Sequence, residues 1–145
     1  MRETLPQAQI SEILVIQNLT LWKRFQTEKE RLMKKNNGNS NTKLVWHGTR
    51  NTAPATLYHG EHGFNINYSN DGMWGPAIYF AVNASYSCPG YSHPVAGQNG
   101  TYQVFLAEVA LGESVELAPN NALKEPPMKD KSKRYDSVSG YTGNS

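Results

Sequence analysis

Residues 72–87 have the sequence GMWGPAIYFAVNASYS and are the most informative stretch about how this chain folds. Ala77 to Ala81 is short, apolar and partly aromatic, which is typical of a buried strand. Asn83 follows it as a candidate N-cap, and residues 84–87 then predict a single helical turn. A short strand followed by a single helical turn does not match a doubly wound fold, in which long helices alternate with the strands.

The sequence before this stretch predicts two further elements. Ile10 to Gln17 contains the run Ile-Leu-Val-Ile and predicts a strand. Asn18 or Thr20 then caps an amphipathic helix that runs to about Lys35 and docks through one apolar face. Lys29 interrupts that face, where its stem packs while its ammonium reaches water.

Two more strands and a second helix are predicted on either side of residues 72–87. We expect a short buried strand over Lys43 to Trp46. The clearest strand pattern in the chain is Gln103 to Leu111, and we expect both faces of this strand to be covered. Thr52 to His59 predicts a short helix with Thr52 as its cap and Pro54 in its first turn. Short strands with a few scattered helices are typical of an α+β domain.

The length and composition limit the architecture to one domain. The chain has 145 residues and a mass of 16.2 kDa, of which 38% are apolar and 18% charged, as in globular proteins. We expect one partial domain over residues 1–145, in which residues 112–145 are loop-like because they carry little periodic apolar pattern. A net charge of +2 is too small to indicate nucleic acid or an anionic membrane as a partner.

The expected location of the protein follows from its cysteine usage and its apolar runs. Cys88 is the single cysteine, which excludes an intrachain disulfide and is typical of a reducing compartment. Residues 1–7 lack the apolar core of a signal peptide, and the longest apolar run, residues 77–82, is far too short to span a membrane. We therefore expect an intracellular protein, nuclear or cytoplasmic, with no membrane partner.

Common catalytic motifs are absent from the sequence, which has no G-x-G-x-x-G, Walker A, H-E-x-x-H, C-x-x-C or G-x-S-x-G pattern. His59 and His62 with His93 or Cys88 would be a conceivable metal site, but the first two lie in a turn-like stretch. Cys88 has no obvious base beside it that would make it a nucleophile. We expect loop and surface roles for these residues, and no metal.

A histidine at the end of a predicted strand is the first candidate site residue. His47 is followed by Gly48 and Thr49, and the glycine leaves backbone N–H and C=O groups open to close approach by a ligand. Two aromatic side chains and a hydroxyl follow along the chain: Tyr79, Tyr91 and Ser87. Together these groups suit a flat heteroaromatic amide, although each also has a structural interpretation as a core or turn residue.

The order of the motifs resembles one known family. The following motifs occur in order along residues 10–140: HGT at 47–49, GFN at 63–65, GMWGPAIYFAVNASYS at 72–87, Tyr91, VFLAEVALG at 104–112, PP at 126–127 and YDSVSG at 135–140. The series resembles the catalytic domain of the poly(ADP-ribose) polymerase (PARP) family, within the diphtheria-toxin-like ADP-ribosyltransferases. The resemblance implies an α+β ADP-ribosyltransferase fold with a split, mostly antiparallel sheet and few helices.

The resemblance also implies an NAD site and gives the candidate residues their roles. His47 would hydrogen-bond the adenosine ribose, and the backbone of Gly48 would hold the nicotinamide carboxamide. Ser87 would add a hydroxyl contact to that amide, and Thr49 would belong to the same NAD-binding set. The resemblance thus implies hydrogen-bonding roles for three of the candidates and includes Thr49 as a fourth NAD-binding residue.

Two tyrosines would hold the nicotinamide ring from its two faces, Tyr79 on one and Tyr91 on the other. His47 and Tyr79 would be the catalytic residues. The implied activity is NAD-dependent: the nicotinamide glycosidic bond breaks through an oxocarbenium-like transition state, and ADP-ribose passes to an acceptor. A protein is the expected acceptor, with nucleic acid as another possibility, and NAD is consumed as a substrate.

The sequence departs from the family pattern at two places. Pro76 precedes the IYFA segment, where family members often have a small or basic residue. The third position of the family's catalytic triad lies on a strand after the YDSV motif, and Glu125, Asp130 and Asp136 do not match it. We therefore expect a domain that is truncated at its C-terminus, with its last strands missing, so the sequence does not separate mono- from poly-ADP-ribosylation.

Two other functions remain open at this point. One is a catalytically inactive module, or a fragment, that binds NAD or ADP-ribose without turnover. The other is an ordinary α+β interaction domain that keeps the motif residues only for packing.

Overall fold

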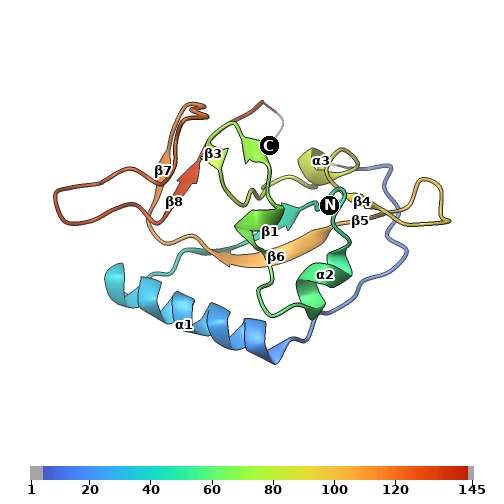
Figure 1. Cartoon of the computed structure of the whole chain (residues 1–145), viewed down its shortest axis with the longest axis horizontal. Helices are drawn as coiled ribbons and strands as arrows, with labels where there is room; N and C mark the ends of the chain where they lie inside the picture. The colour runs from blue at the N-terminus through green and yellow to red at the C-terminus, as the bar shows by residue number, and fades with distance from the viewer. Residues whose placement is uncertain (1–4, 144–145) are drawn as a thin grey trace.

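The centre of the molecule is an antiparallel pair of strands, β1 (Thr42–His47) and β6 (Phe105–Ala110). The structure is a computed structural model that describes residues 5–143, so residues 1–4 and 144–145 of the expected domain lie outside the described residues. The register pairs Thr42 with Ala110 and His47 with Phe105. Figure 1 shows this pair in the middle of the molecule, with the long helix α1 below it.

Helix α1 (Leu19–Lys35) confirms the predicted amphipathic helix and its cap. Asn18 Oδ1 accepts a hydrogen bond from the Leu21 N–H at 3.1 Å, as an N-cap residue does. The apolar face is only partly covered, because Leu32 is buried whereas Trp22 is exposed. The ammonium of Lys29 reaches Glu108 of β6 at 3.2 Å, so this cation sits at the contact between α1 and the central pair.

The remaining elements are short. They are α2 (Pro54–His59), η1 (Ile66–Tyr68), β2 (Asp71–Gly72), β3 (Gly75–Pro76), α3 (Ala84–Ser87), β4 (His93–Pro94), β5 (Tyr102–Gln103), β7 (Ser114–Glu116) and β8 (Ser137–Ser139). The pairs β2–β3 and β4–β5 are antiparallel, and β7–β8 is parallel. Separate small sheets with few helices confirm the predicted α+β class. Within residues 5–143, no helix has the length and hydropathy that a membrane span requires.

The core beside the central pair is aromatic. Phe64 lies edge-on to Phe80 and Phe105, with ring centroids 5.3 and 5.2 Å apart. The ring of His47 packs on the same phenylalanine at 4.8 Å. The buried apolar residues are Leu32, Val45, Leu57, Ala81 and Ala84. The aromatic cluster therefore supports the end of β1 that carries the HGT motif.

The strand predicted over Ile10 to Gln17 is wrong, because these residues form no strand in the structure. Ile13 and Val15 are 78% and 81% exposed. A β-branched run favours an extended backbone, but a strand also needs a partner for its N–H and C=O groups. Among the described residues, no other strand pairs with this segment.

The strand predicted over Ala77 to Ala81 is reduced to a single bridge. The backbone of Ala81 exchanges two hydrogen bonds with Trp46 of β1, at 2.7 and 2.8 Å, while residues 77–80 are unpaired as a strand. The carbonyl of Tyr79 bonds the His47 ring instead of a neighbouring strand. The His47 side chain has thus replaced a neighbouring strand as the hydrogen-bond partner of this carbonyl.

The predicted strand over Gln103 to Leu111 forms as β6, but the prediction that both of its faces are covered is wrong. Leu106 is 51% exposed, and the Glu108 side chain on the same face is 42% exposed. Both faces of this strand carry apolar residues, so the sequence did not indicate which face stays exposed to solvent.

Two predicted helix caps do not form. Helix α2 begins at Pro54 with Ala53 in the N-cap position, so Thr52 is not the cap. A proline in the first turn has no N–H to satisfy, which reduces the need for a capping side chain. Asn83 precedes α3 but makes no side-chain capping bond.

The segment predicted to be loop-like, residues 112–145, is irregular over most of its described part but contains β7 and β8. These strands pair in parallel, with Val115 opposite Val138. Asp136 fixes the segment to the end of α1, since its carboxylate contacts Lys35 Nζ at 2.5 Å and Asn36 Nδ2 at 2.9 Å. The described part is thus anchored to the rest of the fold.

Candidate active site

His47 ends β1 with its ring hydrogen-bonded to backbone. The Nδ1 atom lies 2.7 Å from the carbonyl oxygen of Tyr79, and because a carbonyl can only accept, Nδ1 carries the proton. Burial lowers the pKa of His47, and the bond to this carbonyl raises it by less. The ring is therefore neutral near pH 7, and its Nε2 has a lone pair that can accept a hydrogen bond.

Gly48 lies against the backbone of a second loop. A Cβ atom at this position would be 2.2 Å from the carbonyl oxygen of Tyr91 and 2.7 Å from the Ser92 nitrogen. Such distances are shorter than any real contact, so only glycine allows the two segments to approach this closely. The HGT motif and residues 91–92 thus form one packed unit.

Thr49 has a buried hydroxyl that the described residues leave without a hydrogen-bond partner. An unpaired buried polar group costs about 1–3 kcal/mol. A polar ligand or a water molecule would recover that cost. This orphaned hydroxyl beside Gly48 fits the presence of a hydrogen-bonding ligand at the HGT motif.

Tyr79 is held by the β2–β3 hairpin. Its hydroxyl donates to the Gly75 carbonyl at 2.5 Å and accepts from the Trp74 N–H at 3.1 Å. Its ring packs on Gly72, where a Cβ atom would lie 2.6 Å from Tyr79 Cζ. The ring is therefore fixed in place, and its stacking on a ligand stays a prediction.

Ser87 and Tyr91 lie at the two ends of the turn that follows α3. Ser87 is only 3% exposed, and its carbonyl accepts the Tyr91 N–H at 3.1 Å. Tyr91 is 39% exposed, and its ring stacks on Tyr86, with centroids 5.3 Å apart and planes at 16°. A side-chain hydrogen bond with Tyr91, together with burial, raises the pKa of Tyr86.

The six predicted site residues therefore lie in segments that meet at the end of β1. His47 contacts Tyr79 through its ring, and Gly48 contacts Tyr91 through backbone. Ser87 is joined to this group through the bond from the Tyr91 N–H. The arrangement offers hydrogen-bonding groups and aromatic rings, and the binding roles of these residues stay predictions.

Sequence reasoning missed two residues beside the site. The guanidinium carbon of Arg50 lies 4.3 Å from the centroid of the Tyr91 ring, and Tyr86 stacks on that same ring. Their positions in the sequence could have identified them, because Arg50 directly follows the HGT motif and Tyr86 directly precedes Ser87.

His93 and Cys88, which the sequence offered as a metal ligand or a nucleophile, have other environments in the structure. Among residues 5–143, no three His, Cys, Asp or Glu side chains gather as a metal-ligating group. His93 Nδ1 lies 2.5 Å from the Arg50 carbonyl oxygen. Burial raises the pKa of the Cys88 thiol, which disfavours the reactive thiolate.

Comparison with known proteins identifies relatives over most of the chain. The sequence model of the poly(ADP-ribose) polymerase catalytic domain matches residues 1–142. A Dictyostelium discoideum protein named "probable poly [ADP-ribose] polymerase" is 38% identical over 109 residues, which are 73% of this chain and 32% of that protein. The human protein mono-ADP-ribosyltransferase PARP14 is 34% identical over 145 residues, which are 98% of this chain and 8% of PARP14.

A further relative supports the same similarity at lower identity. Human protein mono-ADP-ribosyltransferase PARP12 is 29% identical over 128 residues, which are 88% of this chain and 17% of PARP12. The chain therefore spans a third or less of the length of these relatives.

Proposed function

Because this chain belongs to the poly(ADP-ribose) polymerase catalytic domain family, we propose that it binds NAD and transfers ADP-ribose to an acceptor, with nicotinamide as leaving group. The observation that carries the proposal is the family match over residues 1–142, which includes the whole candidate site. Several relatives are named protein mono-ADP-ribosyltransferases, and on that basis a protein side chain is the acceptor that we propose.

The contacts around the HGT motif fit such a substrate. Neutral His47 has Nε2 available as an acceptor, which suits a ribose hydroxyl. Gly48 has no side chain to shield its peptide groups, so a carboxamide can pair with its N–H and C=O. The unpartnered hydroxyl of Thr49 gives the site one more polar group that a ligand would satisfy.

The proposed reaction replaces one glycosidic substituent by another. The bond between C1″ of the nicotinamide ribose and the ring nitrogen breaks, and its electron pair leaves with nicotinamide. Positive charge develops on the ribose, the acceptor nucleophile forms the new bond to C1″, and the acceptor's proton passes to solvent. Holding the nicotinamide ring between the tyrosines and its amide on Gly48 fixes the leaving group in a reactive orientation.

The proposal is tested by incubating the purified chain with NAD labelled in its adenylate part, together with a mixture of acceptor proteins. We expect free nicotinamide and label bound to protein. By mass spectrometry, each modified side chain should carry one ADP-ribose unit. NAD binding by calorimetry without nicotinamide release would instead identify an inactive binding module. A chain that neither binds NAD nor releases nicotinamide would refute both functions.

A matched pair of glycine substitutions tests the location of the site. Gly48→Ala places a Cβ 2.2 Å from the Tyr91 carbonyl, whereas Gly90→Ala meets nothing within 4 Å. We expect Gly48→Ala to weaken nicotinamide binding by tenfold or more and to lower stability by about 1–3 kcal/mol. Gly90→Ala should leave the affinity within about twofold of the unchanged chain. Equal affinities for the two variants would place the amide elsewhere.

A further inference from the structure

We propose that Arg50 is a positioning residue that holds the Tyr91 ring in place for the nicotinamide half of the substrate. The inference rests on the proposed function and adds to it a residue that the sequence motifs did not include. Arg50 directly follows the HGT motif, and Tyr91 lies in the turn after α3, 41 positions along the chain. Contacts of its backbone and of its side chain both join these two segments.

The backbone of Arg50 adopts an uncommon conformation that lets it face the second loop. Its φ of +45° lies in the left-handed region, which is uncommon for a residue other than glycine. In this conformation its N–H donates to the Tyr91 carbonyl at 2.8 Å, and its own carbonyl lies 2.5 Å from His93 Nδ1. Such conformations persist where the surroundings hold them, and they cluster at functional sites.

The side chain of Arg50 reaches the same loop at two further points. Its Nε donates to the Gly90 carbonyl at 3.1 Å. Its guanidinium carbon lies 4.3 Å from the centroid of the Tyr91 ring, well within the range of a cation–π contact. The planar guanidinium can make both contacts at once, which the point charge of a lysine cannot.

The Tyr91 ring is therefore held by two elements. Tyr86 of α3 stacks on it with centroids 5.3 Å apart, and Arg50 contacts it from the HGT segment. Gly48 packs on the Tyr91 carbonyl in the same unit, so the amide-binding backbone and the aromatic ring keep a fixed separation. Tyr91 stays 39% exposed beside these two contacts, and a ring that is already ordered costs less entropy when a flat ligand packs against its exposed part.

The test compares Arg50→Asn with the unchanged chain. Asparagine tolerates positive φ, so this variant keeps the backbone conformation while it removes the guanidinium. Arg50→Lys retains the charge without the planar group. Arg31→Ala is the matched control, because Arg31 is an exposed arginine of α1 whose side chain pairs only with Glu28 among the described residues.

Calorimetry measures the affinities for nicotinamide and, separately, for ADP-ribose, and thermal unfolding is followed in parallel. For Arg50→Asn we expect nicotinamide to bind about tenfold more weakly, with unchanged affinity for ADP-ribose and an unfolding midpoint close to that of the unchanged chain. Arg50→Lys should be intermediate, and Arg31→Ala should match the unchanged chain.

Each contrary result identifies a different failure. Equal nicotinamide affinity for Arg50→Asn and the unchanged chain would overturn the inference and leave the proposed function standing. Tighter binding by the variant would also overturn it, since Arg50 would then cover the ring rather than hold it. Equal loss of both ligands with a lower unfolding midpoint would reduce Arg50 to a structural role. An unchanged chain that binds neither nicotinamide nor NAD would overturn the proposed function, and this inference with it.

Discussion

His47 is the residue in which local geometry most directly determines chemistry. The Tyr79 carbonyl accepts a hydrogen bond from Nδ1, which fixes the tautomer of the neutral ring, and the aromatic neighbours keep the ring from turning. The lone pair of Nε2 is thus available without any rearrangement. A protonated ring would lose that lone pair, so the proposed contact to a ribose hydroxyl needs the neutral form.

The pKa of His47 leads to a prediction about stability and pH. Burial lowers the pKa of the folded state below the ordinary value of about 6.5, so between the two values the unfolded chain binds a proton that the folded chain does not. The free energy of unfolding should therefore be highest above about pH 6.5 and fall as the pH drops toward the folded pKa. Urea unfolding between pH 5 and 8 measures this dependence.

The control for this prediction is His47→Asn, whose amide can still donate to the Tyr79 carbonyl but does not titrate. Its free energy of unfolding should fall less steeply between pH 7 and pH 5 than that of the unchanged chain. Identical slopes would show that another group, and not His47, causes the loss.

The residue scale is also where sequence and structure differ most. The residue types and their order along the chain pointed to the candidates, the resemblance to a known family gave them their roles, and the structure brings their segments together. The left-handed backbone of Arg50 and the close approach of Gly48 to Tyr91 depend on how two distant loops meet. No local sequence pattern encodes such a meeting.

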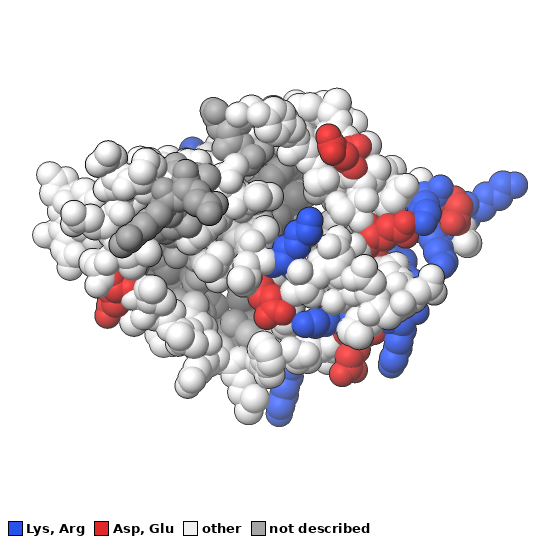
Figure 2. All heavy atoms as spheres, turned by 180° about the vertical axis from the view of Figure 1, so that it is seen from behind, with Lys and Arg blue, Asp and Glu red and all other residues white. Residues whose placement is uncertain are grey.

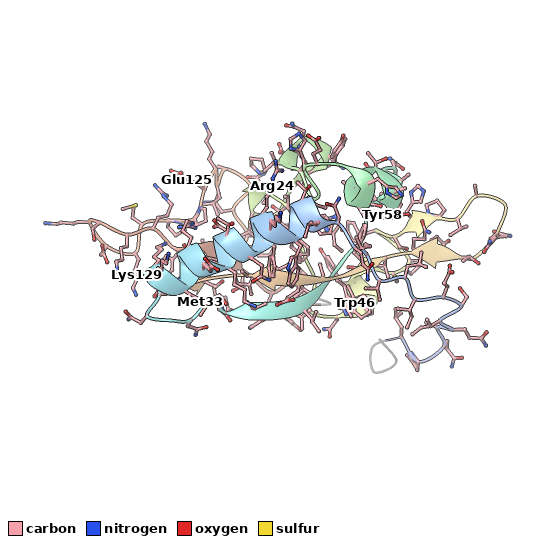
Figure 3. The ribbon with its side chains drawn as sticks, turned by 90° about the horizontal axis from the view of Figure 1, so that it is seen from below. Arg24, Met33, Trp46, Tyr58, Glu125 and Lys129 are labelled. Carbon is pink, nitrogen blue, oxygen red and sulfur yellow. The ribbon has the colours of Figure 1, made fainter. Side chains whose placement is uncertain are left out.

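At the scale of elements, the N-terminal part of α1 is hydrogen-bonded to the segment that contains the end of α2. Asn18 caps α1 through Oδ1, and its Nδ2 donates to the Tyr58 carbonyl at 2.9 Å. Arg24 of the same helix donates to the Glu61 carbonyl at 2.5 Å. Figure 3 shows Arg24 and Tyr58 on these neighbouring helix ends. A capping residue therefore also fixes the position of α2.

Two asparagines at helix starts form a matched test of this double role. Asn18→Ala removes a cap and the bond to Tyr58, and should destabilise the protein by about 1–2 kcal/mol. Asn83→Ala, at the start of α3, removes a side chain that makes no capping bond and should cost less than about 0.5 kcal/mol. Equal costs in chemical unfolding would contradict the assigned cap.

The contact of Asp136 with the end of α1 gives a second prediction at this scale. Burial raises the pKa of this carboxyl, but hydrogen bonds from Lys35, the Glu113 N–H and Asn36 outweigh it, and the net pKa is lowered. The ionised form therefore stabilises the fold above the ordinary pKa of about 3.9, and this contribution is lost as the pH falls through the folded value.

A pair of carboxylate-to-amide substitutions measures this contribution at pH 7. Asp136→Asn should lower the free energy of unfolding by about 1–3 kcal/mol, because the side chain is only 7% exposed and Lys35 would lose its partner. Glu28→Gln, which affects the exposed pair with Arg31, should cost less than about 1 kcal/mol. Similar losses would mean that Asp136 is no more than another surface ion pair.

Helix α1, whose signals are all local, was predicted well. Helix α1 has a cap, helical periodicity and a polar loop after it, and it forms with nearly the predicted bounds. The segment from Ile10 to Gln17 also has a strong local signal, but a strand depends on a partner elsewhere in the chain. Sequence patterns report propensity, and pairing is decided by tertiary structure.

At the scale of the whole molecule, ordered pairing is concentrated in β1 and β6. These strands pair over six residues each, whereas the other sheets have strands of two or three residues. We predict that backbone amides in β1 and β6 exchange slowly with solvent, and that those in residues 10–17 exchange fast. Exchange followed by mass spectrometry would contradict the structure if residues 10–17 were protected as well as β6.

Charge is also unevenly distributed over the molecule. Figure 2 shows the Lys and Arg side chains of this face mostly toward one end. The basic residues of α1 and those of residues 124–134 meet there, since Lys35 Nζ donates to the Arg134 carbonyl at 2.7 Å. Glu113 pairs with Lys129 and Glu125 pairs with Arg134, so part of the positive charge at this end is neutralised.

The contact between Lys35 and Asp136 also constrains how the protein is made. The two residues are 101 positions apart, so α1 leaves the ribosome long before the residue that anchors its end has been synthesised. A nascent chain must therefore present α1 without this anchor until residue 136 has been synthesised. Contacts of such sequence separation also slow folding, because a long loop must close before they form.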